Sequence, residues 1–248
     1  MIGIVGAGNM GTAIARGLGE AIYATDGGSG RAAALVAELG GEALKSNAEL
    51  VKRSDIIILC HEPHMLDAVA AEVDATGKLV ISTLGPTTVA QLQKAFPGAQ
   101  VVRIHPNLPV ELGKGVVCIV EGGEVAKPLF ERIARVVIIP ESKMQIAVAT
   151  MGVTTAYIAV IVEAMVDAAA LNGLTPKLAG EMFLGTLKGA AELIEHRGGD
   201  TLAVRRQVAS PGESTVRGLA ALERGGLRNI FQEAMRDVLT RLNQPYHA

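Results

Sequence analysis

Six residues near the N-terminus have the spacing of a phosphate-binding turn. Gly6-Ala7-Gly8-Asn9-Met10-Gly11 fits the pattern G-x-G-x-x-G directly after the apolar run Ile2–Val5. In such a turn the first glycine allows a sharp bend, the second lets the backbone approach a pyrophosphate, and the third lets a helix pack closely on the strand. The free N–H groups at the start of that helix bind phosphate oxygens. The sequence therefore predicts a dinucleotide site at residues 6–11.

A second group of residues bears on which dinucleotide binds. Asp26 stands twenty residues after Gly6, at the end of a second predicted strand. A carboxylate there accepts hydrogen bonds from ribose hydroxyls and repels a 2′-phosphate, which favours NAD. Ser29 and Arg31 follow in the same loop and could instead bind a 2′-phosphate. The expected cofactor is therefore NADP or NAD.

Apolar runs rich in valine and isoleucine alternate with helical patterns over the first 140 residues. Continuous apolar runs are typical of strands that are covered on both faces. The alternation predicts right-handed crossovers and a mostly parallel, doubly wound Rossmann sheet, and the closer spacing of the last runs allows an antiparallel edge. The predicted strands are Ile2–Val5, Ala21–Thr25, Ile56–Cys60, Leu79–Thr83, Val101–Ile104, Val116–Val120 and Val136–Ile139. The predicted helices between them are Asn9–Leu18, Arg31–Leu39, Asn47–Val51, Met65–Glu72, Thr88–Ala95 and Lys127–Ile133.

After Pro140 helical periodicity replaces the strand pattern. The predicted helices are Gln145–Asn172, Pro176–Glu195, Thr201–Gln207, Thr215–Arg224 and Leu227–Leu242. The expected fold class is therefore α/β, with a Rossmann domain at residues 1–140 and an all-α domain at residues 141–248. The segment Met144–Val162 carries no charged side chain. We expect it to be a helix buried in a core or an oligomer interface rather than a membrane span.

Composition excludes several classes of protein. The 248 residues include 23 basic and 25 acidic side chains, so the chain lacks the basic excess that nucleic-acid binding requires. Hydrophobic residues make up 49%, which is too many for a disordered chain. Two cysteines, Cys60 and Cys118, are too few for a disulfide framework and favour a reducing, cytoplasmic compartment. No basic region precedes the first apolar run, so no signal peptide is expected.

Two further segments carry a resemblance to a known family. Residues 210–223 read S-P-G-E-S-T-V-R-G-L-A-A-L-E, and residues 102–109 read V-R-I-H-P-N-L-P. With the glycine turn and Gly173-Leu174, they make the whole chain resemble the pyrroline-5-carboxylate reductase family of the 6-phosphogluconate dehydrogenase-like superfamily. The resemblance implies NAD(P)H-dependent reduction of 1-pyrroline-5-carboxylate to L-proline, the last step of proline biosynthesis. It also implies a homodimer that is held together by the all-α domain.

The resemblance assigns roles to residues in both predicted domains. Thr215 and Ser210 are expected to be catalytic. Gly212, Glu213, Ser214 and Thr215 are expected to bind the substrate carboxylate, because N–H groups there open a helix. Local sequence alone favours an ordinary capped turn at this place, in which Ser210 or Ser214 bonds a neighbouring N–H, and it is the resemblance that assigns the substrate role. Residues that follow the predicted strands complete the cofactor site: Cys60, His61, Pro63, Leu84, Gly85, His105, Pro106 and Asn107.

The chain departs from the family pattern at several of these positions. Glu213 replaces a glycine, His105 a methionine and Leu108 a threonine, and the family's lysine is missing from the run Cys60–His64. These departures keep alternatives open: a paralogue that reduces another imine or a β-hydroxy acid, or a non-catalytic NAD(P)-binding regulator. Pro63 prevents the two flanking histidines from sharing one helical face, so no metal site is expected.

Overall fold

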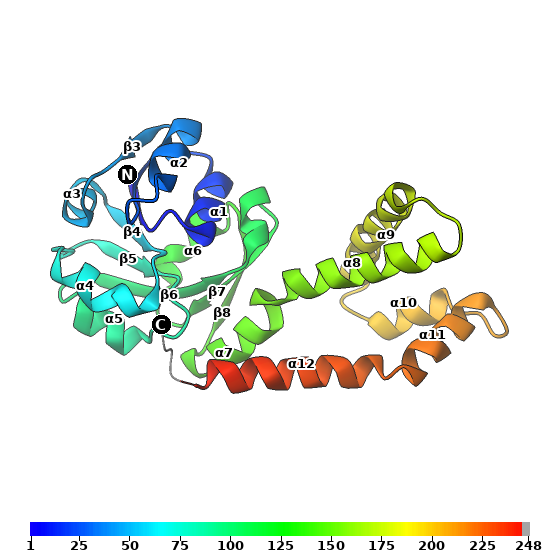
Figure 1. Ribbon diagram of the computed structural model, residues 1–248. Helices are drawn as coiled ribbons and strands as arrows, with labels where there is room; N and C mark the ends of the chain where they lie inside the picture. Colours follow the sequence, from blue (N-terminus) through cyan, green and yellow to red (C-terminus); the bar gives the residue numbers. More distant parts are fainter. Residues whose placement is uncertain (245–248) are drawn as a thin grey trace. The chain divides into compact units, whose positions relative to one another are not determined.

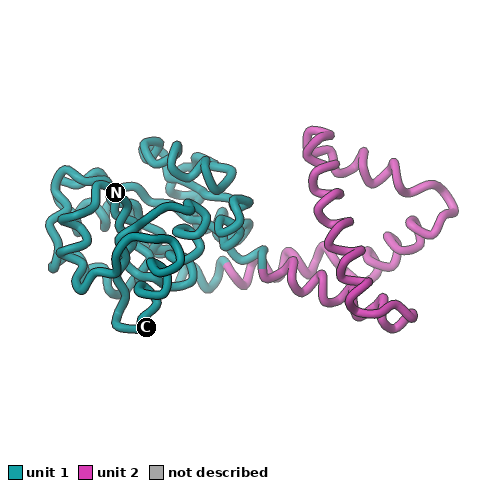
Figure 2. Tube along the Cα trace, turned by 90° about the horizontal axis from the view of Figure 1, so that it is seen from above, with its two compact units in different colours: residues 1–155, 239–248 teal, residues 156–238 magenta. Residues whose placement is uncertain are grey.

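The computed structural model describes residues 1–244, which form two compact units (Figures 1 and 2). Unit 1 comprises residues 1–155 and the segment that begins at Leu239, and unit 2 comprises residues 156–238. The change from strands to helices falls at Ile139, where the last strand ends. The division between the compact units falls later, after Thr155.

Unit 1 contains an eight-stranded sheet whose first six strands are parallel. The strand order is β3-β2-β1-β4-β5-β6-β7-β8, with β7 antiparallel to β6 and β8 parallel to β7. This confirms the doubly wound sheet and the expected antiparallel edge. The strands are β1 Ile2–Val5, β2 Ile22–Thr25, β3 Gly41–Ala43, β4 Ile56–Leu59, β5 Leu79–Ser82, β6 Gln100–Pro106, β7 Gly115–Val120 and β8 Ala134–Ile139.

Helices cover both faces of the sheet because the parallel strands are apolar on both faces. Ile2 and Ile4 of β1 belong to one buried cluster, and Val5 belongs to the other. The first cluster takes its helical residues from α1, α2 and α6, and the second takes them from α3, α4 and α5. These helices are α1 Asn9–Leu18, α2 Arg31–Leu39, α3 Asn47–Arg53, α4 Leu66–Ala71, α5 Val89–Ala95 and α6 Lys127–Phe130.

The helix predicted over residues 145–172 is not continuous, so that prediction is wrong in one respect. A short α7, Met144–Ala147, is followed by a π-helical turn at Val148–Gly152, and α8 runs only from Thr154 to Leu171. Hydroxyl groups satisfy carbonyls along this stretch, since Thr150 donates to Ile146 O at 2.8 Å and Thr154 donates to Thr150 O. Uninterrupted apolar periodicity does not distinguish an α-helix from one with a π insertion.

Unit 2 is helical throughout and has almost no core of its own. Within residues 156–238 the only buried residue is Ala179. Large apolar side chains are exposed instead, including Val160, Met182 and Ile230. The remaining helices of the described chain are α9 Pro176–His196, α10 Thr201–Gln207, α11 Ser214–Arg224 and α12 Leu227–Leu242, the last of which ends in unit 1.

The uncharged segment of the sequence belongs to a helical stretch that is long and apolar enough to cross a membrane. This stretch is Glu141–Leu171, and only 11% of its most apolar window is buried inside the chain. Length and composition alone are weak support for a membrane span, because helices at interfaces between proteins pass the same test. The segment is therefore not a helix buried in the core of this chain.

Candidate active site

The predicted phosphate-binding turn lies where the strand order reverses, between β1 and β4. The Gly6 and Ala7 N–H groups both donate to Thr25 O of β2 at 3.1 Å, and the Cys60 N–H donates to Val5 O at 2.8 Å. The turn is thus tied to the ends of both neighbouring strands. Ligands of open α/β sheets bind at the carboxyl ends of the strands at this switch point.

The three glycines of the turn serve different purposes. Gly6 has φ +102° and a Cβ there would lie 2.6 Å from His61 N, while a Cβ on Gly11 would lie 2.3 Å from Gly6 O. Both are therefore required by the fold. Gly8 has an extended backbone, and apart from its two chain neighbours no residue has an atom within 4 Å of a Cβ built on it. Its missing side chain leaves open space, which fits the close approach of a pyrophosphate.

The start of α1 is free to bind an anion. Gly8 is the N-cap residue, and among the described residues no side chain caps this helix end. Its first N–H groups therefore keep their hydrogen-bonding capacity. Ala7 is buried and Met10 packs against the core, so of the side chains in this turn only that of Asn9 is exposed.

The Asp26 carboxylate organises the loop between β2 and α2. It accepts hydrogen bonds from Gly28 N at 2.9 Å, Ser29 Oγ at 3.0 Å and Ala32 N at 2.9 Å. The hydrogen bond from Ala32 N, more than the others, holds the pKa of Asp26 below its usual value. The carboxylate is therefore charged and fixed at neutral pH.

The loop after β4 places Cys60 and His61 against the glycine turn. Burial raises the pKa of the Cys60 thiol to about 12, so the sulfur stays protonated and is not a nucleophile. His61 Nδ1 lies 2.8 Å from Glu62 O and must carry the proton, because a carbonyl only accepts. His61 Nε2 is buried and has no partner among residues 1–244, and burial lowers the pKa of this imidazole. Pro63 follows at the first position of a 3₁₀ turn, Pro63–Met65.

His105 and Gly85 line one cavity at the carboxyl ends of β5 and β6. The cavity has a volume of about 330 Å³, and Gln145 and Leu242 also line it. His105 Nδ1 is buried without a partner among the described residues, and burial lowers the pKa of His105 to about 4. A neutral imidazole with unused hydrogen-bonding capacity thus faces this cavity. Leu84, which the sequence also assigned to the cofactor site, is buried, and its N–H donates to Ser82 Oγ at 3.2 Å.

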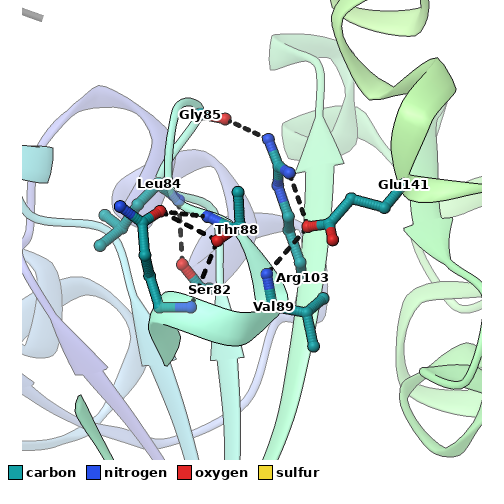
Figure 3. A network of polar contacts seen from close by, with 8 residues as sticks. Ser82, Leu84, Gly85, Thr88, Val89, Arg103 and Glu141 are labelled. Carbon is teal, nitrogen blue, oxygen red and sulfur yellow. Dashed lines mark hydrogen bonds and ion pairs between the residues drawn. The ribbon is translucent and has the colours of Figure 1, made fainter. Parts of the chain in front are cut away.

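An ion pair between the buried Arg103 and the half-exposed Glu141 lies beside this cavity and fixes the loop after β5 (Figure 3). Arg103 Nη1 lies 2.7 Å from Glu141 Oε1, and its Nη2 donates to Gly85 O at 2.6 Å. The same Glu141 oxygen accepts the Val89 N–H at 2.8 Å. Sequence reasoning did not assign a role to Arg103 or Glu141. The one signal for Arg103 was a charged side chain in the middle of an otherwise apolar strand.

Asn107 uses its side chain to hold the end of β6. Its Oδ1 accepts the Val116 N–H at 2.8 Å, and its Nδ2 donates to Met151 O at 3.4 Å. Pro106 precedes it and is buried.

Among residues 1–244, no group of three or more His, Cys, Asp or Glu side chains is placed to hold a metal ion.

The predicted substrate residues lie in unit 2, at the start of α11. Gly212 has φ +83°, Glu213 is the N-cap residue, and Ser214 begins the helix. No side chain of the described residues caps this helix end, and the Glu213 N–H donates to Ser210 O at 3.2 Å. The capped-turn alternative therefore does not describe this segment. Ser210, Ser214 and Thr215 are all exposed.

Comparisons with known proteins agree with this geometry. Residues 141–244 match the model for pyrroline-5-carboxylate reductase dimerisation, and residues 1–86 match the family of NADP oxidoreductases described as coenzyme F420-dependent. The crystal structure of a Plasmodium falciparum pyrroline carboxylate reductase with NADP bound has a TM-score of 0.85 at 24% identity, covering 97% of this chain and 96% of that one. It supports the fold.

Two curated proteins are similar to this chain in amino-acid sequence. A pyrroline-5-carboxylate reductase of Synechocystis sp. is 34% identical over 77% of this chain and 74% of its own length. One of Methanosarcina acetivorans is 30% identical over 94% of this chain and 93% of its own length. The resemblance found in the sequence is therefore confirmed, and the chain belongs to the pyrroline-5-carboxylate reductase family.

Proposed function

We propose that the protein reduces 1-pyrroline-5-carboxylate to L-proline with NAD(P)H. The observation that carries this proposal is the similarity to reductases of this name over nearly the full length of both chains. The dinucleotide fits the turn at residues 6–11 because Gly8 leaves space for its pyrophosphate and the start of α1 offers uncapped N–H groups. When bound, the cofactor supplies the hydride that adds to the imine carbon.

The chain itself needs to provide binding and orientation rather than strong acid–base catalysis, because a protonated imine already accepts a hydride. The uncapped N–H groups at the start of α11 suit the substrate carboxylate, since a helix N-terminus attracts anions. The Thr215 hydroxyl is assigned to the ring nitrogen, and Ser210 to positioning of the same segment. Glu213 at the N-cap is exposed and is assigned to solvent rather than to the substrate anion.

The decisive experiment measures NAD(P)H oxidation by the purified protein with 1-pyrroline-5-carboxylate and identifies the product as L-proline. Turnover is expected in the wild type and a large loss in Thr215→Ala, with cofactor binding unchanged. Thr186→Ala is a matched control, because that hydroxyl only donates to Met182 O within α9. Turnover of a different imine or a β-hydroxy acid would favour the paralogue alternative, and cofactor binding without any turnover would favour a regulatory protein.

The variant Glu213→Gly tests the placement of that carboxylate. If Glu213 points to solvent, the replacement leaves KM for the substrate nearly unchanged. If it faces the substrate, removal of the like charge lowers KM, which would contradict the assignment.

We also propose that the protein is a cytoplasmic homodimer whose copies associate through unit 2, without a membrane or nucleic acid. The match to a dimerisation domain supports this, as do the exposed apolar side chains of α8, α9 and α12. A monomer would leave an apolar surface of that kind in water. Light scattering at about micromolar concentration is expected to give at least a dimer. A monomeric mass would contradict the proposal.

A further inference from the structure

We propose that this protein binds NADH in preference to NADPH, and that Asp26 sets this preference. The inference rests on the proposed function only in taking the turn at residues 6–11 as the dinucleotide site. In such a site the end of the second strand lies beside the adenosine ribose, so the loop from Asp26 to Ala32 meets either a 2′-hydroxyl or a 2′-phosphate.

The carboxylate of Asp26 is held in one orientation and has capacity left for a ribose. Three donors from its own loop occupy it: Gly28 N on Oδ1, and Ser29 Oγ and Ala32 N on Oδ2. Of these donors only the Gly28 N–H is on Oδ1, so this oxygen keeps capacity for a hydroxyl donor. A ribose 2′-hydroxyl can fill this position, whereas a 2′-phosphate has no proton to donate when fully ionised.

The same contacts occupy the groups that would otherwise bind a 2′-phosphate. Ala32 N is one of the first N–H groups of α2, where a helix attracts anions, and it is already bonded to Asp26. The Ser29 hydroxyl is bonded to Asp26 as well. Arg31 is then the one cation between residues 26 and 32, and its single positive charge is matched by the negative charge of Asp26. The loop therefore has no excess of positive charge with which to hold a phosphate.

Charge repulsion adds to the loss of donors. A phosphate monoester carries nearly two negative charges at neutral pH, and the Asp26 carboxylate carries one. Two unit charges about 4 Å apart in water change a binding constant several-fold, so NADPH is expected to bind roughly tenfold or more weakly than NADH.

The test is direct titration of the full chain with NADH and with NADPH, followed by nucleotide fluorescence, with no imine substrate present. The wild type is expected to bind NADH at least about tenfold more tightly. Asp26→Asn keeps the shape and most of the capping of the side chain but removes its charge. This variant is expected to bind NADPH about tenfold more tightly than the wild type does, and the gain should shrink at high salt.

Two further variants serve as a control for Asp26→Asn and as a test of the role of Ser29. Asp74→Asn is the matched control, because Asp74 also accepts a backbone N–H, from Thr76 at 3.0 Å, but lies in the loop before β5. It is expected to leave the NADH-to-NADPH ratio unchanged. Ser29→Ala separates the two roles of that residue: the proposal expects no selective loss of NADPH binding, whereas a serine that held the 2′-phosphate would produce one.

The outcomes distinguish this inference from the proposed function. Equal affinities, tighter binding of NADPH by the wild type, or an unchanged ratio in Asp26→Asn would overturn the inference and leave the dinucleotide site intact. Failure of both nucleotides to bind the folded protein would overturn the proposed function, and the inference with it.

Discussion

Arg103 and Glu141 form an ion pair that joins β6, an interior strand of the sheet, to the 3₁₀ turn Glu141–Lys143 that follows β8. Their charged groups are 2.7 Å apart although 38 residues separate them in the sequence, and the Arg103 side chain is only 6% exposed. Arg103 also donates to Gly85 O, and Glu141 accepts the Val89 N–H (Figure 3). The pair thus holds the β5–α5 loop, β6 and the segment before α7 in one arrangement.

Removal of one partner of this pair is expected to be costly. Glu141→Ala leaves the buried guanidinium without its counter-charge, which should lower the free energy of unfolding by about 2–4 kcal/mol. Urea denaturation of the wild type and the variant at the same protein concentration measures this change in the free energy of unfolding. Glu49→Ala is the control, because Glu49 forms an exposed pair with Arg53 at 3.4 Å, and its loss should cost under about 1 kcal/mol. Equal costs for the two variants would contradict the structural role.

The glycine turn allows ligand binding to be separated from folding. Gly8→Ala places a methyl group in open space on a backbone that alanine tolerates, so stability should change by less than about 1 kcal/mol. Affinity for NADH should nevertheless fall about tenfold or more, since the methyl group occupies the pyrophosphate position. Gly185→Ala, on the open face of α9, should leave affinity unchanged. If Gly8→Ala binds NADH as well as the wild type, the pyrophosphate does not lie there.

His105 should make stability depend on pH in a predictable direction. Burial, and then the nearby charge of Arg103, lowers the pKa of His105 from 6.5 to about 4. Unfolded chains therefore bind the proton first as pH falls, and the folded state loses stability between about pH 6.5 and about pH 4. The contribution of neutral His105 to the free energy of unfolding is fully present above about pH 6.5, and its complete loss lowers that free energy by about 3 kcal/mol at most.

Comparison with His105→Met isolates this contribution. Between about pH 7.5 and about pH 4.5 the wild type should lose roughly 2–3 kcal/mol more than the variant, because carboxylate protonation affects both alike. The exposed His196 provides the control, and His196→Gln should behave like the wild type. Identical pH profiles for the wild type and His105→Met would show that the imidazole is not shielded from water.

His105 and Gly152 should be energetically coupled. A Cβ on Gly152 would lie 2.6 Å from His105 Nε2, so Gly152→Ala must displace the imidazole or the π-helical turn. A loss of about 1–3 kcal/mol is expected. In a His105→Ala background the space is free, and the double-mutant cycle should give a coupling of about 1 kcal/mol or more. Gly189→Ala has open space on α9 and serves as the uncoupled control. Additive costs would contradict the contact.

Much of the α/β unit could be predicted because its signals are local. The helices Asn9–Leu18 and Arg31–Leu39 have the predicted bounds, since glycines end both of them. Strand β3, Gly41–Ala43, was missed because it is three residues long and lacks an apolar run. Its pairing with β2 comes from the sheet rather than from its own composition.

The polar contacts of the site could not be predicted, because they join residues by tertiary structure. The sequence placed Ser29 and Arg31 as alternatives to Asp26 for the ribose end of the cofactor. In the structure the Ser29 hydroxyl donates to Asp26. Ser29 and Asp26 therefore act together at the ribose end of the cofactor and do not compete for it. Nothing in the spacing of residues 26–32 distinguishes these two arrangements.

The C-terminal end of α12 determines the order in which the parts of unit 1 can fold during synthesis. Gln145 Nε2 donates to Leu242 O at 3.3 Å, and Arg241, Leu242 and Gln244 line the cavity that His105 faces. Unit 1 is therefore assembled from two stretches of chain with the whole of unit 2 between them. A ribosome releases all eight strands before it has synthesised the residues that close this cavity. The sheet can form during translation, whereas the wall beside His105 is completed only after the helical unit has emerged.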